Sequence, residues 1–211
     1  MSIQLEKNES IPLIKGNTSI GTLVNRPFVF GIGFTGKNGL DLDLDSYVAV
    51  LDKDNQTLGF VYFNNLKSKG IKHNGDDTSG GGNKNTPNET IKINLSELHA
   101  NASKLIVGMF IFSGASNLSD LKSSFANITN SSGLEVCRFD IKDSFSSSRS
   151  VELAEFHKNS SGEWCFTATG KGSSDKYRQI RNKYTVKASS QSVGDTQSTS
   201  LLGKLSNFLF G

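Results

Sequence analysis

The sequence lacks the features that are typical of secreted and membrane-spanning proteins, namely many cysteines, a secretion signal and a long apolar run. Its 211 residues include only two cysteines, three prolines and one tryptophan, and its formal charge is +3. We expect Cys137 and Cys165 to be reduced, buried apolar residues, because the chain carries no secretion signal; a redox pair is the alternative interpretation. No run approaches the roughly 18 apolar residues of a membrane span, and the N-terminus is acidic where a secretion signal is basic. These absences predict a cytoplasmic protein.

Motifs for common catalytic chemistry are missing as well. The triglycine at 80–82 is not followed by Gly-Lys-Ser/Thr, which excludes a P-loop. His73, His99 and His157 have no partner at zinc-ligand spacing, and no Gly-x-Ser-x-Gly elbow offers a nucleophile. We therefore expect a protein that is not an enzyme. His99 is interpreted as a surface residue, and His73 as either a solvated loop residue or a neighbour of a metal site.

Short apolar segments recur along the chain, with Gly, Asn, Asp and Ser between them. This pattern predicts an all-β, mainly antiparallel sandwich with one or two short helices. The expected strands are residues 19–23, 28–34, 47–51, 60–63, 90–95, 104–112, 134–141, 151–157 and 163–169. We expect this domain to span 1–172, followed by a separate segment at 173–211.

Three features of the domain carry more specific expectations. Residues 104–112 are apolar almost throughout, which predicts a strand buried on both faces at the centre of the core. Phe110, Phe112 and Trp164 are interpreted as packing residues. Residues 119–126 are predicted to form a helix, with Ser119 as its cap.

Alternating Leu and Asp residues fill positions 40–45. In an extended chain Asp41, Asp43 and Asp45 project from one face and the leucines from the other. Like charges about 7 Å apart on one strand repel each other unless a cation neutralises them. A solvated acidic edge strand that resists aggregation is the alternative interpretation.

Oxygen-bearing residues follow at intervals that suit a hard cation. The predicted metal ligands are Asp41, Asp43, Asp45, Asn64, Asn65, Asp76 and Glu89. Calcium takes six to eight oxygen ligands, and the stretch lacks the soft ligands that zinc or copper prefers. An EF-hand fits poorly, because its sixth position would be Ser46 instead of glycine and its twelfth Asp52 instead of glutamate.

Four segments in this order resemble a known family. They are Leu-Asp-Leu-Asp-Leu-Asp at 40–45, Phe-Asn-Asn-Leu-Lys-Ser at 63–68, His-Asn-Gly-Asp-Asp at 73–77 and Glu-Thr-Ile-Lys-Ile-Asn-Leu at 89–95. Over about residues 10–172 the chain resembles the TerD family of tellurium-resistance and stress-response proteins. The resemblance implies a calcium-binding β-sandwich, or a relative such as the cyclic-AMP-binding proteins of that superfamily. Members of the family usually carry further acidic residues in the glycine-rich loop, whereas this chain has a lysine and no carboxylate there before Glu89. This difference predicts weaker calcium binding than is usual in the family.

The end of the chain differs in composition. Residues 175–187 carry Tyr177, Ile180 and Tyr184 at helical spacing among basic residues, which predicts a short basic amphipathic helix. We expect 188–200 to be a disordered linker, and 201–211 to form an apolar helical tail, because its apolar residues recur at helical spacing. Such a tail would pack on its own domain, on a protein partner or on an anionic membrane surface, and we expect no nucleic-acid partner.

Three functions follow from these observations. The first is a calcium-binding stress protein whose metal orders a recognition surface. The second is an adaptor that residues 175–211 recruit to a membrane or an assembly. The third is a metal-assisted phosphoesterase, because carboxylate clusters also hold pairs of metal ions.

Overall fold

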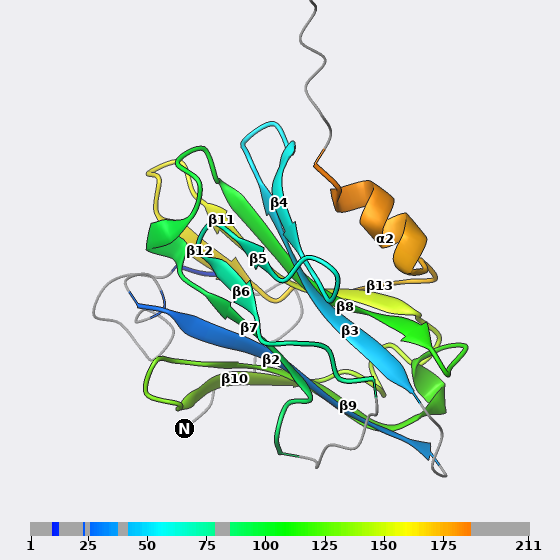
Figure 1. Ribbon diagram of the computed structural model, residues 1–211. Helices are drawn as coiled ribbons and strands as arrows, with labels where there is room; N and C mark the ends of the chain where they lie inside the picture. The colour runs from blue at the N-terminus through cyan, green and yellow to red at the C-terminus, as the bar shows by residue number, and fades with distance from the viewer. Residues whose placement is uncertain (1–9, 13–22, 24–25, 38–41, 79–84, 187–211) are drawn as a thin grey trace, which may run out of the picture.

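The computed structural model describes residues 10–12, 23, 26–37, 42–78 and 85–186, which form two antiparallel sheets packed face to face (Figure 1). The seven-stranded sheet has the order β1 (Ser10–Pro12), β12 (Trp164–Thr167), β11 (Ser150–Lys158), β8 (Lys104–Ser113), β3 (Asp43–Leu51) and β4 (Thr57–Val61), with β13 (Lys171–Ser173) beside β11. The six-stranded sheet has the order β10 (Glu135–Asp140), β9 (Leu121–Thr129), β2 (Phe28–Gly36), β7 (Glu89–Ile93), β6 (Ile71–His73) and β5 (Lys67–Ser68). The predicted sandwich is confirmed.

The main core lies between the sheets and follows the two-residue period of the strands. In β2, Phe28, Phe30 and Ile32 alternate with outward residues and are buried against the opposite sheet. Full burial of one such side chain contributes about 1.5–3 kcal/mol. Eight of the expected strands are present, with ends shifted by a few residues, and 19–22 lie outside the described residues.

The strand β8 is buried on both faces, as its apolar sequence predicts. Leu105 and Val107 face the main core, whereas Ile106 and Phe110 belong to a second apolar cluster on the outer side of the sheet. The packing role predicted for Phe112 is confirmed, although this side chain is 45% exposed at the end of the strand. Its ring still contacts the rings of two neighbours, Phe63 and Tyr177.

The second cluster is covered by the helix α2 (Tyr177–Tyr184), which confirms the predicted amphipathic helix (Figure 1). Ile180 and Tyr184 are buried against the outer face of the sheet, where Tyr184 contacts the rings of Tyr47 and Phe60. The apolar stripe of this helix is therefore occupied within the chain. Residues 187–211, which include the predicted linker and tail, lie outside the described residues.

The prediction of a helix at residues 119–126 was wrong. A single 3-10 turn, η4 (Leu118–Asp120), is capped by Asn117, and the chain then continues as β9. This strand lies between β2 and β10 and forms a ladder with each of them. Inward Ala126 and Ile128 alternate with outward Phe125, so tertiary pairing overrides a weak helical periodicity.

The cysteines behave as expected. Cys137 and Cys165 are free and buried, on strands of different sheets, and burial raises the pKa of the Cys137 thiol to about 12. Trp164 is 8% exposed and belongs to the main core, which confirms its predicted role.

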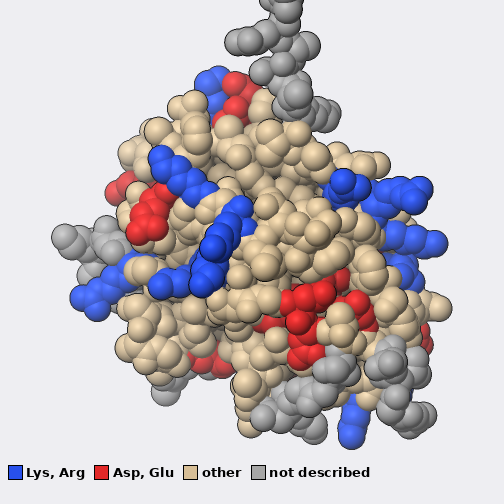
Figure 2. Space-filling view, viewed as in Figure 1, with Lys and Arg blue, Asp and Glu red and all other residues tan. Residues whose placement is uncertain are grey.

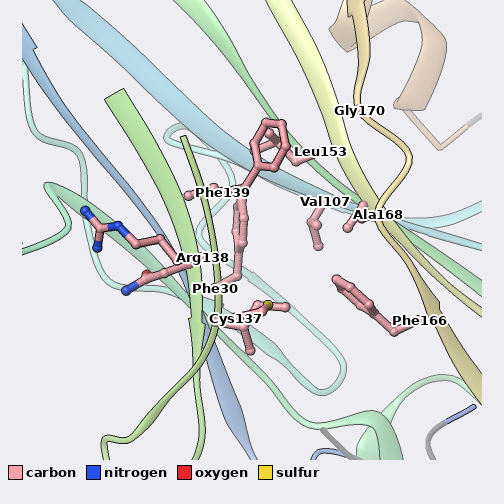
Figure 3. A pocket seen from close by; sticks show the side chains of 13 residues that line it. Phe30, Val107, Cys137, Arg138, Phe139, Leu153, Phe166, Ala168 and Gly170 are labelled. Atoms are coloured by element: carbon pink, nitrogen blue, oxygen red, sulfur yellow. The ribbon is translucent and has the colours of Figure 1, made fainter. Parts of the chain in front are cut away.

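A small apolar cavity lies between the sheets (Figure 3). Phe30, Val107, Leu153 and Phe166 line it, and its volume is about 50 Å³. Binding sites for organic ligands usually measure about 300–1,000 Å³. Figure 3 shows the guanidinium of Arg138 directed away from the cavity, and this group stacks on the Phe125 ring at 3.6 Å. We therefore interpret the cavity as a packing defect.

Candidate metal centre

Two of the predicted ligands, Asp43 and Asp45, lie at the start of β3. The neighbouring Leu42 and Leu44 are buried in the main core, so the alternation turns both carboxylates to the other face of the strand. That face is not open to solvent at this point, because Asp45 is 1% exposed and Asp43 is 9% exposed. A solvated acidic edge is therefore the wrong interpretation of these two residues.

The loop that follows β6 brings a third carboxylate to the pair. One ligand atom from each of Asp43, Asp45 and Asp76 lies within 4.8 Å of the others. Oxygens that bind one calcium ion at 2.3–2.6 Å are at most about 5 Å apart, so these three atoms fit a shared ion. Figure 2 shows acidic side chains gathered on this face, to the lower right of its centre. We call Asp43, Asp45 and Asp76 the carboxylate group.

Two members of the carboxylate group, Asp43 and Asp45, have buried oxygens that lack partners from the described residues. Both carboxylate oxygens of Asp45 and Oδ1 of Asp43 are buried there without a hydrogen-bond partner. In the same part of the chain, no lysine or arginine forms an ion pair with any of the three residues. A buried carboxylate without donors or a counter-ion is strongly unfavourable, which makes a bound cation the natural complement.

The pKa values describe the same imbalance. Burial, followed by the negative charges of Glu89 and Asp43, raises the pKa of Asp45 to about 9. Burial and the charges of Asp76 and Glu89 raise the pKa of Asp43 to about 6. The pKa of Asp76 is also raised, first by burial and then by Glu89. Without a cation, the charged forms of these groups repel one another.

Glu89 lies beside the carboxylate group, but its oxygens already have partners. Oε2 accepts hydrogen bonds from the backbone nitrogen of Ser46 at 2.7 Å and from its hydroxyl at 2.8 Å. Oε1 accepts one from the backbone nitrogen of Asp77 at 3.3 Å. Glu89 is 1% exposed and lies at the start of β7. Its hydrogen bonds therefore join β7 to β3 and to the loop after β6.

His73 is part of this network. It is buried in β6, which agrees with the interpretation of a residue next to the site and not with that of a solvated loop residue. Its Nδ1 accepts a hydrogen bond from the backbone of Gly75, so in the neutral ring the proton is on Nε2. Nε2 lies 3.1 Å from the Ser46 hydroxyl and 3.5 Å from Glu89 Oε2. His73 therefore donates to Ser46, which donates to Glu89.

The remaining predicted ligands have other surroundings. Asn64 and Asn65 are exposed, in a turn closed by backbone hydrogen bonds between Tyr62 and Asn65. The Asn65 side-chain amide donates to the carbonyl of Phe60 at 2.5 Å. In the described residues no hydrogen bond joins either asparagine to the carboxylate group. Asp41 lies outside the described residues.

Two residues that support the site were not predicted from the sequence. Ser46 occupies an inward position of β3, in line with Leu42 and Leu44, and a polar residue at such a position signals a buried hydrogen-bond partner. Asn88 accepts from the backbone of Phe34 at 2.8 Å and donates to Asp77 at 3.3 Å, which fixes the loop after β6 to β2.

Comparisons with known proteins agree with this architecture. The TerD domain family matches residues 1–184. The chain belongs to the TerD family. Among its relatives, the stress response protein SCP2 of Bacillus subtilis is 30% identical over 87% of this chain and all of its own length. The tellurium resistance protein TerD of Serratia marcescens is 26% identical over 90% of this chain and all of its own length.

Solved structures of other proteins have a similar fold. A protein of unknown function, SAV2460, superposes with a TM-score of 0.65 at 18% identity, over 74% of this chain and 95% of its own. A homologue of telluride resistance protein from Streptomyces coelicolor superposes with a TM-score of 0.63 at 17% identity, over the same shares. The TerD family is thus one of tellurium resistance and stress response, and the names of these relatives specify no reaction.

No membrane-spanning helix was found in the described residues, since none of their helices combines the necessary length with the necessary apolar character.

Proposed function

We propose that this TerD protein is a non-enzymatic calcium-binding protein of the chemical-stress type. Asp43, Asp45 and Asp76 would hold the ion, with Asp41, Asn64, Asn65 and loop carbonyls as candidate further ligands. The observation that supports this proposal most strongly is the burial of both Asp45 oxygens without a donor from the described residues, next to two more carboxylates. Only oxygen ligands are present in this group, which favours a hard cation.

The ion would join parts of the chain that are distant in the sequence. Asp43 and Asp45 belong to β3 of one sheet, whereas Asp76 follows β6 of the other. The network of Ser46, His73 and Glu89 already fixes the base of this junction. Neutralising the three aspartates would fix the loop above it, so that the loop presents a defined surface to a partner.

A metal-assisted phosphoesterase gains no support from the geometry. The imidazole that contacts this part of the site is His73, whose side chain is fully buried and engaged with Ser46, Glu89 and Gly75. A general base must reach the proton that it removes from a substrate or a water molecule. His73 has no such access in this arrangement.

Isothermal titration calorimetry of the full chain, freed of metal with a chelator, tests the proposal. We expect calcium to bind with a stoichiometry of one ion per chain, and magnesium to bind more weakly. Asp45→Asn should abolish the heat of calcium binding, because it removes the charge while keeping the shape of the side chain. Asp143→Asn is the matched control, since the Asp143 side chain is 92% exposed. The absence of calcium binding, or equal binding by Asp45→Asn, would contradict the proposal.

A further inference from the structure

Three lysines lie side by side on the outer face of the six-stranded sheet. Lys67 of β5 is paired with Lys72 of β6, and Lys72 is paired with Lys92 of β7. Directly opposed residues of antiparallel strands project from the same face, and adjacent strands are about 4.8 Å apart. All three residues are exposed, and Figure 2 shows basic side chains gathered over these strands. We call Lys67, Lys72 and Lys92 the lysine ladder.

The lysine ladder is unfavourable for the protein alone. Like charges that directly oppose each other destabilise a sheet. Within the described residues, none of the three lysines has an ion pair with an acidic residue. Lysines often protect edge strands from aggregation, but that explains only Lys67, because β6 and β7 are interior strands. The charges of Lys72 and Lys92 point to a partner outside the chain.

The surroundings of the lysine ladder suit an oxyanion. A hollow of about 280 Å³ lies beside it, lined by Lys72 and Lys92 together with Ser68 and Asn94. Hydroxyl and amide groups next to two ammonium groups can share the oxygens of a phosphate. Lys69 is exposed in the turn between β5 and β6 and adds a further positive charge. Among the described residues that line the hollow, Glu97 is the one carboxylate.

The shape of this face distinguishes between anionic partners. The lysine ladder lies on strands of a sheet, and the helix beside its hollow, η3 (Leu95–Glu97), is a three-residue turn that is too short to enter a groove of duplex DNA. The described residues of the lysine ladder and the hollow include no aromatic side chain on which bases could stack. A planar layer of anionic headgroups, in contrast, can meet several lysines of a flat face at once.

We propose that the lysine ladder binds the phosphate groups of anionic phospholipids, so that this face of the sheet lies on an anionic membrane surface. Each lysine near such a surface strengthens binding roughly fivefold. The interaction requires neither calcium nor residues 187–211, so it is independent of the function proposed above.

Co-sedimentation of the full chain with lipid vesicles tests the proposal. The vesicles contain either phosphatidylcholine alone or phosphatidylcholine mixed with phosphatidylserine, and a chelator keeps calcium from contributing. We expect binding only to the mixed vesicles, and at least a tenfold loss of binding in the triple variant Lys67→Gln, Lys72→Gln and Lys92→Gln, because three charges are removed. The charge-conserving triple variant with arginine at the same positions should bind like the parent chain.

A matched control removes the same charge from scattered exposed positions, in the triple variant Lys53→Gln, Lys122→Gln and Lys171→Gln. This control should keep most of the binding. Equal losses in the two glutamine variants would overturn the proposal, since only net charge would then matter. The proposal would also be overturned if the parent chain did not co-sediment with anionic vesicles, or if it bound duplex DNA and not the vesicles. Thermal unfolding of each variant verifies that the sandwich is intact.

Discussion

Asp45 and Glu152 are carboxylates on the outer side of the same sheet, and the protein treats them in opposite ways. Glu152 of β11 accepts hydrogen bonds from Lys183 and Tyr184 of α2. Burial alone would raise the pKa of Glu152, but these two partners outweigh it and lower the pKa. Asp45 has no such partner among the described residues, and its pKa is raised to about 9.

The difference shows what the fold supplies at each position and what it leaves out. At Glu152 the chain provides a cation and a donor from its own helix, so the site is complete. At Asp45 it provides two more carboxylates instead, which makes the burial more unfavourable. A protein that satisfies one buried acid so fully would be expected to satisfy the other, and a calcium ion would do so.

The largest loss of stability is expected from substitution of Glu89, whose hydrogen bonds hold Ser46 and Asp77 next to the carboxylate group. Glu89→Ala leaves the backbone and hydroxyl donors of Ser46 and the backbone donor of Asp77 without this acceptor. We expect a loss of about 3 kcal/mol in the free energy of unfolding, measured with urea, because buried unsatisfied donors are costly. A loss below about 0.5 kcal/mol, the usual range of a surface substitution, would show that the network is not structural.

Two buried tyrosines of the second apolar cluster, Tyr184 of α2 and Tyr47 of β3, sharpen the comparison. The Tyr184 hydroxyl donates to Glu152 at 2.6 Å, whereas the Tyr47 hydroxyl is buried without a partner in the described chain. Tyr184→Phe should therefore cost about 1 kcal/mol, and Tyr47→Phe should be neutral or stabilising. Thermal unfolding of both variants measures the contrast. Equal losses would mean that the two hydroxyls are in equivalent environments.

The contribution of Glu152 should depend on pH in a defined direction. Its pKa is lower in the folded state than the ordinary value of 4.5, so its ionised form adds stability above that pH. This stability is lost as the pH falls through the folded-state pKa. We expect Glu152→Gln to be less stable than the parent at pH 7 by under about 1 kcal/mol, and the gap to close in acid. A gap that is constant from neutral to acidic pH would contradict this assignment.

Much of the fold follows from the sequence, because strand period and turn residues are local signals. The same is true of half of the site: alternation turns Asp43 and Asp45 to one face of β3, and Asp76 follows in an Asp-rich loop. The network of Ser46, His73 and Glu89 depends on which strands of the two sheets oppose each other, and no local pattern specifies that. Alignment of Lys67, Lys72 and Lys92 likewise depends on register, and β9 is a strand because of its neighbours.

The most direct measurement compares Asp45→Asn with Glu152→Gln by thermal unfolding, each with chelator and with calcium. If a cation completes the carboxylate group, Asp45→Asn raises the stability of the metal-free protein and loses the response to calcium, which at a hundredfold excess over Kd is about 2.7 kcal/mol. Glu152→Gln then lowers stability and keeps the full response to calcium. The account is contradicted if the parent chain does not respond to calcium, or if Asp45→Asn responds as strongly as Glu152→Gln.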